Sequence, residues 1–365
     1  MTPTGDTLEG AREAVRHRSW SEACAFYTSL DEDALAPEDL EAKADALWWT
    51  SQIEASTAVR QKAYAGYSAR GDRARAAYAA WFISLDYDMK GEPAVASGWS
   101  MRAKRDVAGQ PPSTVHGLLA LADAREKHMR GDLDAALQHA TDALELGNAL
   151  GDTNLLALAT QTIGRVLISA GRVEEGTTLL DEAMTTVVAG LIDPLFTGAI
   201  YCDVLSTCVE IGDIPRAAEW TAAAARWYEQ ISASSPFHGL CRVHRVEVAM
   251  LRGAWDDAHA DAQRASVELA TIGAPHAASA VYYLGEICRR RGDLKNAEMH
   301  FARASGRSGD TLIARRKPDA AADAFCCASL TSAMPGCGSW PKACARAKCI
   351  SAFFRSPRRR QISPR

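Results

Sequence analysis

The side chains that could carry chemistry are few and dispersed in this sequence. His244 lies between Arg242 and Arg245 in "CRVHRVE", where a ligand or a general base would have charged neighbours, but a histidine on a packed helix is more often structural. Cys202 and Cys208, on one predicted helix, lack the spacing of a metal site. The sequence contains no Gly-rich phosphate loop, no H-E-x-x-H pair and no G-x-S-x-G elbow. We therefore expect no catalytic residue, no metal and no cofactor, and an enzyme is the least favoured class.

The tryptophans offer a second kind of site. Trp48 and Trp49 are adjacent in "ALWWTSQ", and Trp220 and Trp227 lie on one predicted helix. Both pairs fit helix packing, and an aromatic platform for a ligand is the alternative. The first five of the ten cysteines are scattered singly on apolar faces, which indicates buried thiols in a cytosolic chain.

The elements that must position these residues form a repeat. The phrase "RRGDLKNAEMHFARA" at residues 290–304 recurs upstream at steps of 39, 41, 41 and 40 residues. The glycines that align are Gly292, Gly253, Gly212, Gly171 and Gly131. Five residues after each glycine stands a small residue: Ala297, Ala258, Ala217, Gly176 and Ala136.

Each period predicts a helix A, a tight turn and a helix B. Glycine suits a left-handed turn that ends helix A, a following Asp can cap helix B, and the small residue lets the two helices approach closely. One hairpin cannot bury its apolar face alone, so neighbouring hairpins must stack. The predicted fold is an all-α, tetratricopeptide-like, right-handed solenoid of helical hairpins, with about 40 residues per unit and an irregular C-terminal tail. A non-repetitive helical bundle is the alternative.

The N-terminal third fits this scheme less cleanly. Gly91 in "MKGEPAVASGW" lies one step before Gly131, and Ala23 in "HRSWSEACAFY" takes the small-residue position. Gly71 instead matches the break between units at Gly151. We expect about seven helix pairs between residues 7 and 305.

Equivalent positions of the A helices line up along the concave face of such a solenoid. Six residues before each turn glycine stand Arg125, Arg165, Ser206, Glu247 and Glu286. This column changes from positive to negative, so a peptide or helix with oppositely charged ends could lie along it. The alternative is a solvated polar face with i,i+4 pairs. We expect a protein or peptide partner in this groove, with a small effector as a further option.

Several phrases carry a family resemblance. The Gly-Asp followed by Ala, with "YYLGEICRRRGD" before it, resembles the tetratricopeptide repeat, in which Gly285 takes the place of the first-helix glycine. "GRVEEGTTLLDEAM", "RAAEWTAAAARWYE" and "CRVHRVEVAMLRGAW" resemble the repeat region of actinobacterial LuxR-family transcriptional regulators, over about residues 8–324. The resemblance implies that this chain is the sensory or regulatory part of such a regulator. Those relatives continue into a DNA-binding helix-turn-helix, which is not recognisable here. A free-standing tetratricopeptide scaffold for protein–protein interaction is the alternative.

The charges are unevenly distributed along the 365 residues. Residues 310–365 hold 11 Lys and Arg against 3 Asp and Glu, whereas the other 309 residues hold 30 against 42. The acidic body argues against direct DNA binding, because that affinity depends on Lys and Arg displacing counterions. No apolar run approaches the ~18 residues of a membrane span, and the start lacks a secretory signal. We expect a cytoplasmic protein that binds no membrane, of unknown oligomeric state.

The sequence divides into four segments. We expect degenerate helical repeats at 7–110, regular repeats at 111–305, the start of a further repeat at 306–324, and a disordered, basic, Cys-rich tail at 325–365. The tail has no acidic residue and no helical periodicity, and its cysteines match no zinc knuckle. Back-translation of "FCCASLTS" with GC-rich codons gives a helix-like sequence in a shifted frame. Our hypothesis is therefore that the tail results from a frame shift; a mobile basic end is the alternative.

Overall fold

A computed structural model describes residues 3–231, 235–271 and 274–308. These ranges contain α-helices and no strand. The α-helices are α1 (Pro3–Arg16), α2 (Trp20–Thr28), α3 (Pro37–Trp49), α4 (Ile53–Arg70), α5 (Arg73–Met89), α6 (Pro93–Val107), α7 (Thr114–Met129), α8 (Leu133–Leu150), α9 (Thr153–Ser169), α10 (Val173–Val188), α11 (Pro194–Ile211), α12 (Ile214–Tyr228), α13 (Pro236–Leu251), α14 (Trp255–Glu268), α15 (Ala274–Arg290) and α16 (Leu294–Ser308). Two 3-10 helices, η1 (Glu32–Ala34) and η2 (Leu269–Thr271), complete the described elements.

The helices pack in consecutive pairs, so the fold is the all-α helical-hairpin solenoid that the repeat predicts. Within the described ranges there are eight hairpins, from α1 with α2 to α15 with α16. The expectation of about seven pairs is therefore one too low. In the first two hairpins the left-handed residue of the turn is not glycine: Arg18 has φ 56° and Ser51 has φ 60°. Both turns are still followed, five residues later, by a fully buried small residue, Ala23 and Ser56.

The turns inside the regular hairpins are left-handed. Gly131, Gly171, Gly212, Gly253 and Gly292 have φ of 78°, 86°, 75°, 76° and 83°. An L side chain rarely adopts this conformation, so the backbone explains why glycine recurs there. Where Asp follows the glycine, its carboxylate accepts a hydrogen bond from the backbone N–H three residues on, as the capping role requires: Asp132, Asp213 and Asp293. Arg172 and Ala254 occupy this position in the other two units and make no side-chain cap.

Close approach of the paired helices explains the small residue five positions later. Ala136, Ala217 and Ala258 are fully buried, and Ala297 is 3% exposed. At Gly176 an added Cβ would lie 2.4 Å from the carbonyl oxygen of Gly164 on the facing helix. A larger residue at this position would therefore have to separate the two helices.

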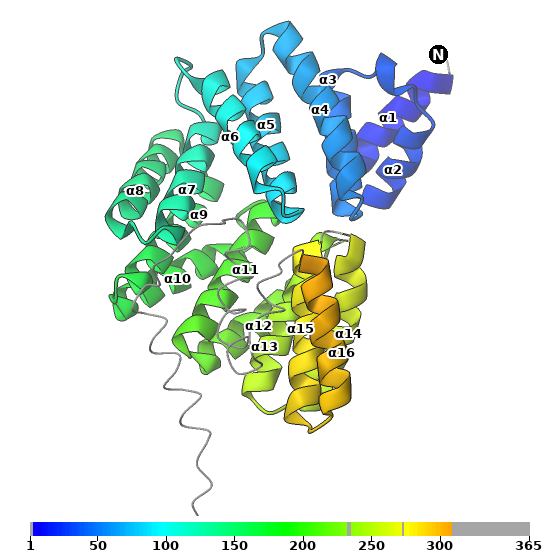
Figure 1. The fold of residues 1–365 in the computed structure, drawn as a ribbon. Coiled ribbons are helices and arrows are strands. Elements are labelled where there is room, and N and C mark those ends of the chain that lie inside the picture. Colours follow the sequence, from blue (N-terminus) through cyan, green and yellow to red (C-terminus); the bar gives the residue numbers. More distant parts are fainter. Residues whose placement is uncertain (1–2, 232–234, 272–273, 309–365) are drawn as a thin grey trace, which may run out of the picture.

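The hairpins follow a curved path that brings distant parts of the stack together (Figure 1). They run from α1 at the upper right, through α7–α10 on the left, to α13–α16 at the lower right. Aromatic rings join the two arms: the centroid of Trp48 on α3 lies 5.6 Å from that of Phe237 on α13, and Trp81 on α5 lies 6.3 Å from Phe196 on α11. We call the rings that meet here the aromatic closure: Trp48, Trp49, Trp81, Phe196 and Phe237.

One helix corrects an expectation about membranes. α11 is long and apolar enough to span a bilayer by length and composition, with a mean hydropathy of 1.2, although the sequence analysis found no such run. Half of this helix is buried inside the structure, where it packs against α9, α12 and α13. Its apolar character is thus that of a core helix with neighbours on several sides.

The expectations for the C-terminal end lie outside the described residues. Only residues 306–308 of the segment 306–324 are described, as the last turn of α16. The whole of 325–365, with its cysteines and basic end, falls beyond the described ranges.

Candidate functional site

The first helix of each hairpin, which we call the A helix, lines the inner side of the arc. The aromatic closure is built from α3, α5, α11 and α13, all of which are A helices. Rings from opposite arms can meet only if these helices face one another. We use "inner face" for the side of the A helices that carries these contacts.

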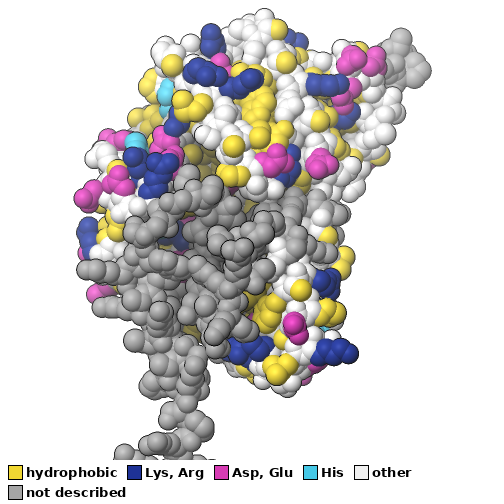
Figure 2. Space-filling view, in the orientation of Figure 1, with side chains coloured by type: hydrophobic (Ala, Val, Ile, Leu, Met, Phe, Trp, Pro, Cys, Tyr) yellow, Lys and Arg dark blue, Asp and Glu magenta, His cyan; other side chains and the backbone are white. Residues whose placement is uncertain are grey.

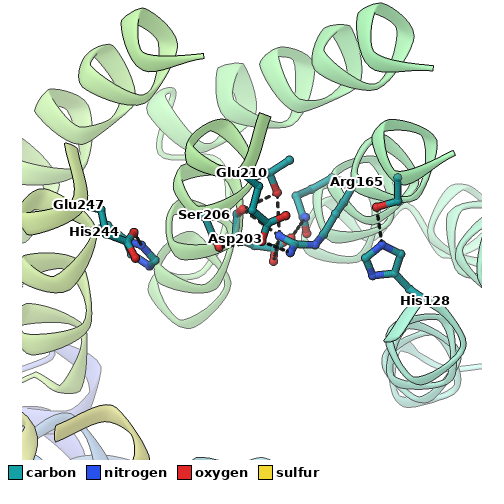
Figure 3. Close-up of polar contacts among 10 residues, drawn as sticks. His128, Arg165, Asp203, Ser206, Glu210, His244 and Glu247 are labelled. Atoms are coloured by element: carbon teal, nitrogen blue, oxygen red, sulfur yellow. Dashed lines mark hydrogen bonds and ion pairs between the residues drawn. The ribbon is translucent and has the colours of Figure 1, made fainter. Parts of the chain in front are cut away.

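Arg165 on α9 is the centre of a polar network on the A helices (Figure 3). Its Nη1 donates to Asp203 Oδ1 at 2.8 Å and to Thr207 Oγ1 at 2.7 Å, and its Nη2 donates to Glu210 Oε1 at 2.9 Å. Gln161 Nε2 also donates to Asp203. The Arg165 side chain is only 12% exposed, so its charge is neutralised inside the protein rather than offered to solvent. Burial raises the pKa of the Glu210 carboxyl.

His128 on α7 extends this network to the preceding hairpin. Its Nε2 lies 2.7 Å from Ser169 Oγ on α9. Burial, followed by repulsion from Arg165, lowers the pKa of His128 to about 4, so the ring is neutral at pH 7. We call the residues that connect α7, α9 and α11 the polar ladder: His128, Gln161, Arg165, Ser169, Asp203, Thr207 and Glu210.

The structure places the five residues of the predicted column on five successive A helices, but few of their side chains are exposed to solvent. Arg125 on α7 is 55% exposed and lies 3.5 Å from Asp88 of α5. Ser206 on α11 is half-buried, with its hydroxyl 3.4 Å from Glu210.

The other three members of the column have internal partners. Arg165 belongs to the polar ladder. Glu247 on α13, 11% exposed, contacts His244 at 3.2 Å and accepts a hydrogen bond from the Tyr283 hydroxyl of α15. Glu286 on α15 is 5% exposed and pairs with Arg289 and Arg290 at 2.7 and 2.6 Å. The charges of the column are therefore largely neutralised by partners within the chain.

A cluster of thiols and polar side chains lies one hairpin beyond the ladder. Cys202 Sγ on α11 is 3.5 Å from Cys241 Sγ on α13. Cys241 also contacts the Tyr228 hydroxyl of α12, and His244 follows Cys241 by one helical turn. We call Cys202, Tyr228, Cys241, His244 and Glu247 the thiol cluster. The sequence analysis singled out Cys202 and His244 separately and missed Cys241, whose signal is its separation of 39 residues from Cys202, close to the repeat period.

The predicted tryptophan pairs take part in packing. Trp48 and Trp49 are 3% and 7% exposed in the aromatic closure. Trp227 is half-buried, and its ring lies 5.8 Å from those of Tyr201 and Phe237. Trp220 packs, half-buried, against the same core. These contacts agree with the packing interpretation of both pairs.

A layer of charged side chains connects α3, α4 and α5 next to the aromatic closure. The side chain of Arg60 on α4 is fully buried; its Nη2 donates to Asp45 Oδ1 at 2.8 Å, and its guanidinium carbon lies 3.8 Å from the ring centre of Phe82. On α5, Asp86 accepts a hydrogen bond from Thr57 at 3.0 Å, and burial raises its pKa to about 6. Because these residues come from α3, α4 and α5, the layer holds the three helices as one unit.

Exposed apolar side chains are spread over the surface. The large ones that are most exposed are Val267 at 72%, Leu294 at 66%, Leu191 at 65% and Val188 at 54%, and they lie on or next to α10, α14 and α16. Figure 2 shows charged side chains of both signs among the hydrophobic ones on the visible face. Apolar residues dispersed in this way are normal for a protein surface and mark no site. Within the described ranges, no group of three or more His, Cys, Asp or Glu side chains is placed to hold a metal ion.

Comparison with known proteins adds little beyond the fold. No protein-family model and no curated protein matches the chain. Among solved structures, BtubC from P. vanneervenii is 12% identical, with 87% of this chain and 95% of that chain covered and a TM-score of 0.29. A human IFIT1 dimer with PPP-AAAA is 13% identical over 83% and 82%, with a TM-score of 0.39. The TPR domain of P58(IPK) is 10% identical over 97% and 100%, with a TM-score of 0.27. Scores this low transfer no function to this chain.

Proposed function

We propose that this chain is a non-catalytic helical-repeat scaffold that binds a protein or peptide partner on the inner face of its A helices. The observation that carries the proposal is the alignment of one polar position per hairpin along α7, α9, α11, α13 and α15. Solenoids of this kind present extended concave surfaces whose residues come from equivalent positions of successive units. A partner that crosses several hairpins would contact side chains far apart in the sequence.

The accessible residues of the column lie on α7 and α11. Arg125 is exposed and its contact with Asp88 is long, so a partner carboxylate can replace Asp88 at little cost. Ser206 is half-buried, and Glu210, whose side chain is 36% exposed, lies next to it. Arg125 and Ser206 offer a cation and a hydroxyl, whereas Glu210 is already paired with Arg165. Of the buried members of the column, Arg165 and Glu247 contact the next A helix, and Glu286 pairs with residues of its own helix.

The test is affinity capture with the immobilised full-length chain and with two matched variants. Arg125→Glu reverses the exposed charge of the column. Arg130→Glu reverses a similarly exposed charge five residues further along the chain, where Arg130 pairs with Glu126 at 2.7 Å. A true inner-face partner should lose about five- to tenfold in affinity with Arg125→Glu, little with Arg130→Glu, and more at low than at high salt. Equal recovery of every captured protein by both variants would contradict the proposal.

We further propose that the chain is the sensory or regulatory part of a LuxR-type transcriptional regulator, separated from the DNA-binding domain of that regulator. Its partner would then be a protein that takes part in the control of transcription. The support is the resemblance of the repeat phrases in the sequence. Nucleotide sequence downstream of codon 324 tests this: a helix-turn-helix encoded in another frame favours the regulator, and its absence leaves a free-standing scaffold. Binding of the purified chain to promoter DNA at physiological salt would contradict separation from a DNA reader.

A further inference from the structure

The thiol cluster is a site that the scaffold function does not use. We propose that Cys202 and Cys241 form an oxidisable dithiol, in which Cys202 reacts with a hydroperoxide and Cys241 then converts the product into a disulfide between α11 and α13. This site needs no partner on the inner face. Its failure in experiment is therefore separate from failure of the scaffold proposal.

The geometry brings the two sulfurs together before any reaction. Cys202 Sγ and Cys241 Sγ are 3.5 Å apart, and a disulfide bond needs about 2 Å. Cys202 is partly exposed whereas Cys241 is buried. An oxidant from solvent therefore meets Cys202 first, and Cys241 is already positioned to attack the oxidised sulfur.

The surroundings of Cys202 favour its reactive thiolate form. A hydrogen bond with Cys241 lowers the pKa of Cys202 against the opposing effect of burial, and His244 lowers it further, to about 6. Burial lowers the pKa of His244, but hydrogen bonds with Cys202 and Glu247 outweigh it and raise this pKa to about 10. At pH 7 the pair is therefore a thiolate beside an imidazolium, which is how reactive cysteines are activated in general. Glu247, at 3.2 Å from His244 Nδ1, orients the ring.

The chemistry balances with a hydroperoxide as the oxidant. The Cys202 thiolate attacks the distal peroxide oxygen and becomes a sulfenic acid, while the O–O bond breaks and the leaving oxygen takes a proton from the His244 imidazolium. The Cys241 sulfur then attacks the sulfenic sulfur, and its thiol proton leaves with the hydroxyl group as water. The two thiols lose two electrons in total, and the peroxide is reduced to an alcohol or to water.

The other described cysteines lack this combination. Burial raises the pKa of Cys208 to about 12 and also raises those of Cys24 and Cys288. Each of these thiols is predominantly protonated at pH 7, and Cys208 lies on the same helix as Cys202. Cys208 is therefore the natural internal control for selective oxidation.

The disulfide would also act on the aromatic closure. Phe196 lies on α11 and Phe237 on α13, one turn before Cys241, so the bond would join the two helices that carry one side of the closure. A cross-link between two helices that already pack together limits the unfolded chain more than the folded one. We expect the oxidised protein to melt about 5 °C higher than the reduced protein.

The experiment treats the fully reduced full-length chain with one equivalent of hydrogen peroxide, blocks the remaining thiols by alkylation and maps the peptides by mass spectrometry. Cleavage on the amino side of Asp separates Cys202 from Cys208, because Asp203 lies between them. The expected product is a cross-link between the fragments that contain Cys202 and Cys241. Cys208 should stay alkylated. Absence of this cross-link in protein with an unchanged circular dichroism spectrum, or oxidation of Cys24 and Cys208 at the same rate, would overturn the proposal.

Three variants separate the steps. In Cys241→Ser the sulfenic acid at Cys202 should persist and be trapped by a dione reagent, and in Cys202→Ser no trapping should occur at Cys241. His244→Gln should slow oxidation of Cys202 at pH 7 at least tenfold and move the rate profile to higher pH. The charged and titratable groups that face the site come from four helices: Asp203, Tyr228, Arg245, Glu247 and Tyr283. An unchanged pH profile in folded His244→Gln would show that His244 does not activate the thiol.

Discussion

The aromatic closure and the polar ladder are both built on A helices, of which they share α11, but they connect the hairpins in opposite ways. The closure joins segments far apart in the sequence, such as Trp48 and Phe237, through rings at 5.6 Å, and its tryptophans and phenylalanines are almost fully buried. The ladder joins neighbouring hairpins, about one period apart, through charged and polar side chains such as Arg165 and Asp203. The contrast indicates that apolar contacts hold the curvature of the array, whereas polar contacts fix the register of each hairpin against the next.

Loss of Phe237 should have the largest effect, because it removes the ring shared by Trp48 and Trp49. We expect Phe237→Ala to cost about 3–5 kcal/mol of unfolding free energy, and to open the arc so that the radius of gyration rises in X-ray scattering. Gly198→Ala should also lower stability, because the added Cβ would lie 2.4 Å from the Phe237 ring and displace it from its place between α11 and α13.

The matched control for this prediction is Phe301→Ala in the last hairpin. Phe301 packs at 5.4 Å from Tyr282 and takes no part in the closure. It should lower stability without changing the radius of gyration. An unchanged radius in Phe237→Ala as well would show that the closure does not hold the arc.

Removal of Arg165 should break the polar ladder and have the second largest effect on the free energy of unfolding. Arg165→Met leaves Asp203 and Glu210 without their cation, and their partial exposure places the cost at about 2–3 kcal/mol, below that of a fully buried pair. Denaturant titration measures this. Arg130→Met, which removes an exposed pair, should cost less than about 0.5 kcal/mol. If the two variants are equally stable, the ladder is a solvated face.

Overpacking inside a hairpin tests the repeat itself. Ala217 is fully buried between α11 and α12, so Ala217→Leu should cost roughly 1–3 kcal/mol. The exposed Glu219 on the same helix should accept Leu within about 0.5 kcal/mol. Thermal melting of the two variants measures the difference, and equal tolerance would mean that the assigned register is wrong.

The turn glycines should show a similar or smaller effect through backbone strain alone. Gly292 has φ 83° and no atom near its missing Cβ, so Gly292→Val should cost on the order of 1–3 kcal/mol. Gly98 is equally open but has a helical backbone, and Gly98→Ala should be neutral or stabilising. Equal melting temperatures of wild type and Gly292→Val would contradict the left-handed strain argument.

The smallest effect concerns pH and the ladder. The pKa of His128 is lowered to about 4 in the fold, below the unfolded value of 6.5. Its contribution to stability is therefore present above pH 6.5 and is lost as the pH falls through about 4. His128→Gln should reduce the loss of melting temperature between pH 7 and pH 4, whereas Ser169→Ala, which keeps the titrating ring, should not. An identical pH dependence in His128→Gln and wild type would show that this ring does not resist protonation.

The sequence by itself determined the unit of this fold. A glycine at one position and a small residue five positions later report a left-handed turn and a close helix pair, because both are local demands of the backbone within one hairpin. The same period places residues such as Arg165 and Asp203 on adjacent A helices, but it does not show that their side chains pair. The turn at Ser51 carries no such signal, because Ser51 takes the left-handed conformation without being glycine, and the turn at Arg18 was indicated only by Ala23.

Only the tertiary structure decided how the hairpins close on one another. The meeting of Trp48 with Phe237 depends on the small angle between consecutive hairpins, added over several units, and no pattern in the sequence records that sum. The structure likewise decided which polar residues are free: Arg125 is exposed whereas Glu286, at the equivalent position, is buried between Arg289 and Arg290. The proximity of Cys202 and Cys241 has the same origin, since it depends on how two hairpins pack and not on either hairpin alone.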